Sequence, residues 1–160
     1  MVDRETFATG AAVRKAAGSG ALTEQTSGLA PGHVQANLVA LPVHVAHDLL
    51  QFCLKNPKAC PLLAVTTIPG DPVLRLKDQA PINLAKEIPA YRVLDENGEW
   101  KEGSVQDVED MWKEEKLVGF VIGCSFSFEK ALQDAGIPVR HIDKGENVPM
   151  YNTNIPCEKQ

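Results

Sequence analysis

A cysteine and two serines stand where an apolar segment gives way to a helical pattern. The apolar run LVGFVIG spans residues 117–123, and Cys124, Ser125 and Ser127 follow at once. Such a run is typical of a strand buried on both faces. In open α/β sheets, ligands bind beyond the carboxyl ends of strands, where helix N-termini present unpaired N–H groups. These amides favour an anion such as a carboxylate, and they favour the thiolate form of Cys124.

The same segment also has a purely structural interpretation. Cys124 would then be a small buried side chain, and Ser127 would be an ordinary helix N-cap. The spacing leaves both interpretations open. The segment is not a G-x-S-x-G nucleophile elbow, because Gly-Cys-Ser-Phe-Ser has a serine where that motif needs its second glycine. Serine-hydrolase chemistry is therefore disfavoured.

Further polar side chains are candidates for substrate binding or proton transfer. The fork of Arg140 can bind both oxygens of a carboxylate, and His141 can move a proton near neutral pH. Both fall on a predicted strand, where neighbours face opposite ways, so at most one would face a given site. Asn37 shares a polar strand face with Gln35, and this face either orients a polar ligand or is solvated. Asn154 belongs to a polar cluster near the end of the chain.

The patterns for metal ions and disulfides are weak. His44 and His47 are three residues apart with Asp48 beside them, but the pattern supplies no third ligand, so surface histidines are favoured. None of the four cysteines forms a C-x-x-C pair, which favours reduced thiols in a cytosolic protein; they are Cys53, Cys60, Cys124 and Cys157.

The elements that must position these residues follow from the apolar spacing. We expect helices over 3–17, over 43–56 after Pro42, and over 126–136, with a further helix opened by a capping box at Ser104 and Asp107. We expect strands from His33 to about residue 41, over 117–123 and over 137–142. The last two strands and the helix between them predict a right-handed βαβ unit.

The chain is predicted to be an α/β protein with an inserted β-rich part. Residues 58–103 hold five prolines, the short strand PLLAVTT, a PGDP turn and a hairpin closed at Asn97–Gly98. We therefore assign 1–57 and 104–160 to an α/β core and 58–103 to a small β-rich subdomain.

Composition excludes several classes of protein. The 160 residues are 44% apolar and 23% charged, which is typical of a globular chain with a core of its own. The net charge is 16 − 21 = −5 without long blocks of one sign, which argues against a nucleic-acid partner. No apolar run approaches the length of a membrane span, and the acidic start has no secretory h-region. We expect a cytoplasmic protein, or a mitochondrial matrix protein in a eukaryote.

Four separated segments resemble one known family in the right order. TSGLAPGHVQANLVALP, FCLKNPKACPLL, GCSFSFEKALQDAGIPVRHI and NVPMYNTNIPC together resemble the hydro-lyase family that includes D-glutamate cyclase, from about residue 22 to residue 157. The resemblance implies a three-layer α/β/α sandwich with a smaller α+β part. It implies a lyase that closes D-glutamate to 5-oxo-D-proline with loss of water, and no nucleotide cofactor. The resemblance leaves open whether a divalent cation takes part in the reaction.

The resemblance and the residues together suggest a working scheme. The helix N-terminus at 124–127, with Ser125 and Ser127, would hold one substrate carboxylate, and Arg140 would hold the other. Cys124 or His141 would move protons, and Asn37 and Asn154 would orient the substrate.

Family members continue beyond this length, which leaves three alternatives: a truncated form, a natural short form, or one piece of a larger assembly. A homo-oligomer or a missing C-terminal segment is a candidate partner, and the short chain alone could be inactive. Two alternatives remain, a non-catalytic module that binds amino acids or carboxylates and a structural fragment of a larger assembly.

Overall fold

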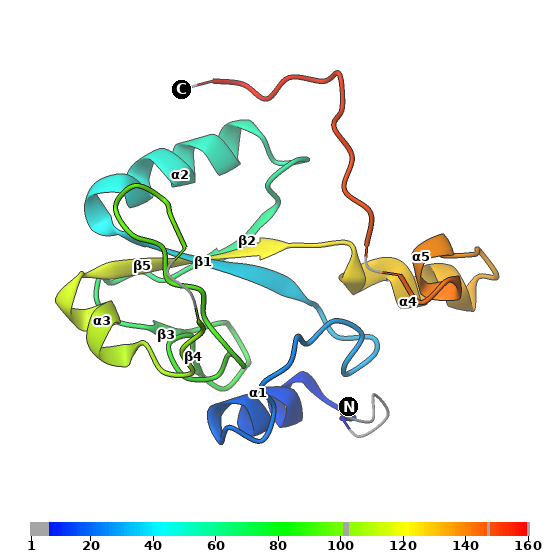
Figure 1. Cartoon of the computed structure of the whole chain (residues 1–160), viewed down its shortest axis with the longest axis horizontal. Helices are drawn as coiled ribbons and strands as arrows, with labels where there is room; N and C mark the ends of the chain where they lie inside the picture. The colour runs from blue at the N-terminus through cyan, green and yellow to red at the C-terminus, as the bar shows by residue number, and fades with distance from the viewer. Residues whose placement is uncertain (1–6, 101–102, 147, 160) are drawn as a thin grey trace.

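The structure is a computed structural model that describes residues 7–100, 103–146 and 148–159. It shows a mixed α/β fold in which a small antiparallel sheet is covered on both faces (Figure 1). Within the described residues, no helix combines the length and the apolar character needed to cross a membrane.

The main sheet has β5 at its centre. β5 (Leu117–Gly123) pairs with β1 (Ala36–Pro42) on one side and with β2 (Leu62–Val65) on the other, and both pairings are antiparallel. The register places Ala36 opposite Gly123, so β1 begins where β5 ends. The prediction of a central strand at 117–123 is confirmed. Its continuous apolar character follows from packing on both faces.

One face of the sheet is covered by α2 (Val43–Lys55), which begins directly after β1. Ala46 of α2 packs with the buried side chains of Val118 and Phe120, and Leu49 and Leu50 of the same helix pack against this cluster. Pro42 is the N-cap residue of the helix, where its missing N–H costs nothing. The predicted helix after Pro42 is therefore confirmed.

The opposite face carries α3 (Glu109–Glu114) together with the short strands β3 (Val73–Leu74) and β4 (Ile82–Asn83). Trp112 of α3 is fully buried here among Leu84 and its neighbours. Helices therefore do not cover both faces in the same way, and a three-layer α/β/α sandwich is not confirmed. The finding supports the broader α/β class.

The helix with Trp112 begins later than the sequence suggested. The capping box at Ser104 and Asp107 does not form, because the helix starts at Glu109 and not at residue 105. Asp107 instead accepts a hydrogen bond from the Glu109 amide at 2.8 Å. A short acidic side chain just before the first turn satisfies an amide that the helix itself leaves unpaired.

The middle of the chain does not stand apart from the sheet. β2 belongs to the stretch 58–103, yet it pairs along β5. The hairpin predicted around Asn97–Gly98 is present as an isolated bridge between Leu94 and Trp100, with Gly98 at φ 78°. The predicted hairpin segment is YRVLDENGEWKE, and its last two residues, 101–102, lie outside the described residues.

The first helix is shorter than predicted. α1 spans Gly10–Gly18, because the Thr9 side chain accepts a hydrogen bond from the Ala12 amide and caps the helix there. The predicted start at residues 3–6 lies outside the described residues. Val13 packs with Leu22, Leu29 and Ala30 in a separate small cluster.

The end of the βαβ prediction is wrong. α4 (Phe126–Asp134) is confirmed, but residues 137–142 are not a strand, and α5 (Arg140–Asp143) occupies their second half. Both sides of β5 are already taken by β1 and β2, so no strand position remains beside it. Gly136, at φ 73°, ends α4 and turns the chain back, so that α5 lies against α4 (Figure 1).

Candidate active site

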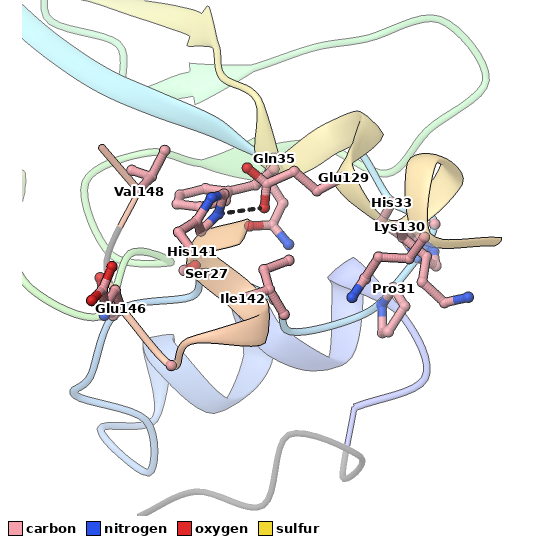
Figure 2. A pocket seen from close by; sticks show the side chains of 16 residues that line it. Ser27, Pro31, His33, Gln35, Glu129, Lys130, His141, Ile142, Glu146 and Val148 are labelled. Atoms are coloured by element: carbon pink, nitrogen blue, oxygen red, sulfur yellow. Dashed lines mark ion pairs between the residues drawn. The ribbon is translucent and has the colours of Figure 1, made fainter. Parts of the chain in front are cut away.

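A cavity of about 430 Å³ lies beside α4, beyond the end of β5 (Figure 2). Its walls come from three segments that are far apart in the sequence: the loop over 25–35, one face of α4, and the stretch over 141–148. The size falls within the range of roughly 300–1,000 Å³ that is usual for small-molecule sites.

A buried carboxylate is the main chemical feature of the cavity wall. Among the described residues, Glu129 is the only buried charged side chain, with 7% of its surface exposed. The Ser125 hydroxyl donates to Glu129 Oε1 at 2.9 Å, and His141 Nε2 lies 3.3 Å from Glu129 Oε2. Figure 2 shows the Glu129 and His141 side chains pointing toward each other. A buried carboxylate is costly unless it is paired, and these two contacts supply the pairing.

The contact between Glu129 and His141 is loose enough to depend on the state of the ring. His141 Nε2 is buried and makes no hydrogen bond of good geometry, although the carboxylate oxygen is near. A protonated ring would gain an ion pair here, whereas a neutral ring leaves Nε2 with an electrostatic contact alone. The fold thus places an imidazole nitrogen and a carboxylate oxygen 3.3 Å apart beside the cavity.

Two structural features bring these three side chains together. Ser125 and Glu129 are four residues apart, so they lie on the same side of α4 one turn from each other. The turn at Gly136 then returns the chain, and α5 presents His141 to α4. His141 reaches Glu129 only because its segment is a helix that folds back, which a strand continuing away from α4 would not allow.

Cys124 and Ser127 make contact with the backbone of Gln35. The Ser127 hydroxyl accepts from the Gln35 amide and donates to the Gln35 carbonyl, both at 2.9 Å. The Cys124 thiol donates to the same carbonyl at 3.5 Å. The Gln35 side chain donates to the Leu29 carbonyl at 3.0 Å and lines the cavity. Cys124 and Ser127 thus hold the entry to β1 against the start of α4.

The predicted site residues are therefore divided between several places. All seven lie in the described part of the chain, and of these only His141 lines the cavity. Ser125 does not line the cavity, but its hydroxyl donates a hydrogen bond to Glu129, which does. Cys124 and Ser127 contact Gln35. Three are exposed and outside the lining: Asn37 on β1, Arg140 at the start of α5 and Asn154 in the C-terminal segment. Their functional roles stay predictions.

Sequence reasoning missed Glu129, although a signal for it was present. Phe126, Glu129, Lys130 and Gln133 are spaced i, i+3, i+4 and i+7, and all four line the cavity. That spacing places them on one face of a helix. A face with three polar side chains opposite an apolar stripe usually indicates solvent, which is why it was not singled out. His33 and Glu146 were missed as well, because exposed polar residues outside regular elements give no spacing signal.

Comparisons with known proteins agree with the family suggested by the sequence. Residues 118–160, which include α4, α5 and all of β5 except Leu117, match the family model described as D-glutamate cyclase. This match covers every residue of the cluster formed by Ser125, Glu129 and His141.

Curated relatives extend the similarity to most of the chain. A protein of Bordetella petrii named "Putative hydro-lyase Bpet2233" is 52% identical over 149 residues, which are 91% of this chain and 53% of the relative. A "Putative hydro-lyase" of Verminephrobacter eiseniae is 49% identical over 150 residues, 94% of this chain and 53% of the relative. The chain spans about half the length of the curated relatives it matches. The chain belongs to the D-glutamate cyclase family, and the relatives that resemble most of its length carry the name "Putative hydro-lyase".

Proposed function

We propose that this chain contributes the proton-transfer part of a hydro-lyase site that closes D-glutamate to 5-oxo-D-proline with loss of water. Family membership supports the reaction class. The observation that carries the proposal is the buried carboxylate of Glu129, which lies between Ser125 and His141 on the wall of a cavity large enough for an amino acid.

The reaction requires two protons to move between two atoms of one substrate. The amino nitrogen attacks the carbon of the distal carboxyl group, a C–N bond forms, and one C–O bond breaks. The nitrogen passes from an ammonium to a lactam N–H and so gives up two protons, and the departing oxygen takes both and leaves as water. A group that accepts a proton near the nitrogen and returns one near the leaving oxygen lowers the barrier for both halves.

His141 and Glu129 together meet this requirement. The imidazole of His141 can accept the proton from the amine, and the resulting charge would be balanced by Glu129 at 3.3 Å. His141 can then give the proton to the leaving oxygen. Ser125 is a positioning residue, because its hydroxyl fixes the other carboxylate oxygen and thereby the direction in which Glu129 faces the ring.

The rest of the cavity suits a substrate with two carboxylates. Lys130 and His33 line it and can carry positive charge, while Glu146 and Glu129 offer negative charge for an ammonium group. Lys130 is also paired with Asp134. Holding the substrate in a folded shape would supply much of the rate, since ring closure joins two parts of one molecule.

The direct test is an assay for loss of one water. The chain is incubated with D-glutamate and with L-glutamate, and the products are followed by mass. We expect turnover of the D form, and Glu129→Gln should lower kcat by about 10²–10⁴-fold because it removes the charge that balances the imidazolium. The matched control is Glu96→Gln, an exposed glutamate in the hairpin turn, which should leave kcat unchanged.

Because the relatives are about twice as long, the same assay is repeated with this chain fused to the C-terminal half of the Bordetella petrii protein. The proposal is supported if the fusion turns over D-glutamate and if Glu129→Gln abolishes that turnover. Thermal stabilisation by D-glutamate without turnover in either form would indicate an amino-acid-binding module instead. A folded fusion that neither turns over nor is stabilised would leave only a structural role.

A further inference from the structure

Gln35, directly before β1, stands where two walls of the cavity meet. Its backbone N–H donates to the Ser127 hydroxyl at 2.9 Å, and its carbonyl accepts from the same hydroxyl at 2.9 Å, which fixes it to the first turn of α4. Its side-chain Nε2 donates to the Leu29 carbonyl at 3.0 Å. Gln35 also lines the cavity (Figure 2). Both its backbone and its side chain are therefore held in place beside the space that a ligand would fill.

The contact with Leu29 determines which way the carboxamide of Gln35 faces. A backbone carbonyl only accepts hydrogen bonds, so the atom that meets it must be the nitrogen of the carboxamide. The oxygen, Oε1, is on the other arm of the planar group and is directed away from the Leu29 carbonyl. The hydrogen bonds of Gln35 within the described part of the chain use its N–H, its carbonyl and Nε2, and none of them ends on Oε1. This oxygen is a fixed acceptor with its capacity unused.

We propose that Gln35 is a substrate-binding residue whose Oε1 accepts a hydrogen bond from the ammonium group of an amino acid in the cavity. The inference rests on the proposed function, because it places the amine of D-glutamate in that cavity. An ammonium group has three N–H donors and no acceptor, so it requires oxygens around it. A hydrogen bond with one charged partner is roughly twice as strong as a neutral one.

A neutral acceptor suits the proposed proton transfer better than a carboxylate would. The amine must give up protons before it can attack, and a negative charge in direct contact with it would favour its protonated form. A carboxamide oxygen orients the nitrogen without adding a full charge, which leaves His141 to accept the proton. Ser127 fixes Gln35 to the same helix that carries Glu129, the partner of His141. The acceptor and the proposed base thus share one support.

A purely structural role for Gln35 makes a different prediction. Leu29 is buried and packs with Val13 and Leu22, so the carboxamide of Gln35 also holds a loop that forms part of the cavity wall. A displaced loop would weaken the binding of every ligand of the cavity. A lost ammonium contact would weaken only ligands that carry an ammonium group. A comparison of two ligands therefore separates the two roles.

D-Glutamate and glutarate are the two probes. Glutarate carries the same two carboxylates on a chain of the same length and lacks the ammonium group. Isothermal titration calorimetry measures both dissociation constants, on this chain and on its fusion to the C-terminal half of the Bordetella petrii protein. Gln35→Met keeps the length of the side chain and removes its donor and its acceptor. We expect this variant to weaken D-glutamate binding about 10-fold more than glutarate binding.

Three further variants make the comparison decisive. Gln35→Glu keeps an acceptor oxygen and loses the donor to Leu29, so it should retain the parent's preference for D-glutamate over glutarate even where both affinities fall. Gln79→Met, at an exposed glutamine between β3 and β4, is the matched control and should change neither dissociation constant. Circular dichroism checks that each variant folds, and Gln35→Leu replaces Gln35→Met if the latter does not.

Two results would overturn the inference, and they are distinguishable. Equal losses for D-glutamate and glutarate in Gln35→Met would assign Gln35 to the loop alone and leave the proposed function intact. If neither form of the parent protein binds D-glutamate, the proposed function and this inference fall together.

Discussion

The two ends of β5 are held in different ways. At its start, Leu117–Phe120 are buried, and the fully buried Trp112 and Leu84 pack against this half. At its end, Val121–Gly123 are only partly buried, and the chain beyond them is fixed by hydrogen bonds of Gln35, Pro61 and Glu129. One strand thus passes from an apolar core into a polar junction within seven residues.

This difference shows where chemistry can be placed in a small fold. The first half is covered mainly by apolar packing, and its buried side-chain hydrogen bond, from the Gly119 amide to the Thr66 hydroxyl at 2.9 Å, joins neutral groups. This half can support the sheet but offers no group that transfers a proton. The polar end depends on pairs of atoms in defined positions, and a change in one partner there alters the others. The buried carboxylate of Glu129 occurs at this second end, where its partners come from α4 and α5.

The largest effect should come from removing the apolar side chain that covers the first half of β5. Trp112→Ala should lower the free energy of unfolding by about 3–5 kcal/mol, because it leaves a large cavity under the sheet. Trp100→Ala is the matched control, since Trp100 is 50% exposed, its ring lies under Arg92, and its Nε1–H donates to the Gly103 carbonyl at 3.0 Å. It should cost less than about 1 kcal/mol. Urea unfolding followed by far-ultraviolet circular dichroism measures both, and equal costs would contradict the comparison.

A smaller effect on the free energy of unfolding is expected from adding one methyl group in each half of β5. A Cβ at Gly119 would lie 2.9 Å from two ring carbons of Trp112 and 3.1 Å from Leu84, so Gly119→Ala should cost about 1–3 kcal/mol. A Cβ at Gly123 would lie 3.5 Å from Leu63, an ordinary contact. Gly123→Ala should therefore stay within about 0.5 kcal/mol of the parent protein. The same urea titration applies, and a larger cost at Gly123 would mean that the polar end is packed as tightly as the core.

The sequence predicted those parts of the fold that local pattern determines. The apolar run of β5, the helix after Pro42 and the helix ended by Gly136 were all identified from spacing and breakers. The pairing of the strands could not be predicted, because an apolar run does not indicate which strands lie on either side of it. With β1 and β2 on either side of β5, the segment after Gly136 had no partner and became a helix. That outcome depends on tertiary context, which overrides local propensity.

The candidate site was predicted less well than the fold, for a related reason. His141 was chosen for its chemistry and lies on the cavity wall, but it was placed on the wrong kind of element. Glu129 was passed over because a glutamate beside a lysine on a helix is usually solvated, and only the return of α5 buries it. Cys124 was predicted to move protons and Ser127 to hold a substrate carboxylate, and spacing could not reveal that Gln35, 89 and 92 residues earlier, contacts both.

The smallest effect should follow from breaking the contact between α4 and the start of β1. Ser127→Ala removes both hydrogen bonds to Gln35 and should cost about 1 kcal/mol, since the freed backbone groups of Gln35 are only partly buried and water can replace the hydroxyl. The control is Ser19→Ala, whose exposed hydroxyl donates to one carbonyl, and which should change stability by less than about 0.5 kcal/mol. Hydrogen exchange adds a local readout: the Gln35 amide should exchange faster in Ser127→Ala while the Phe120 amide does not. If both amides accelerate equally, the two ends of β5 open as one unit, and the polar junction cannot rearrange independently of the core.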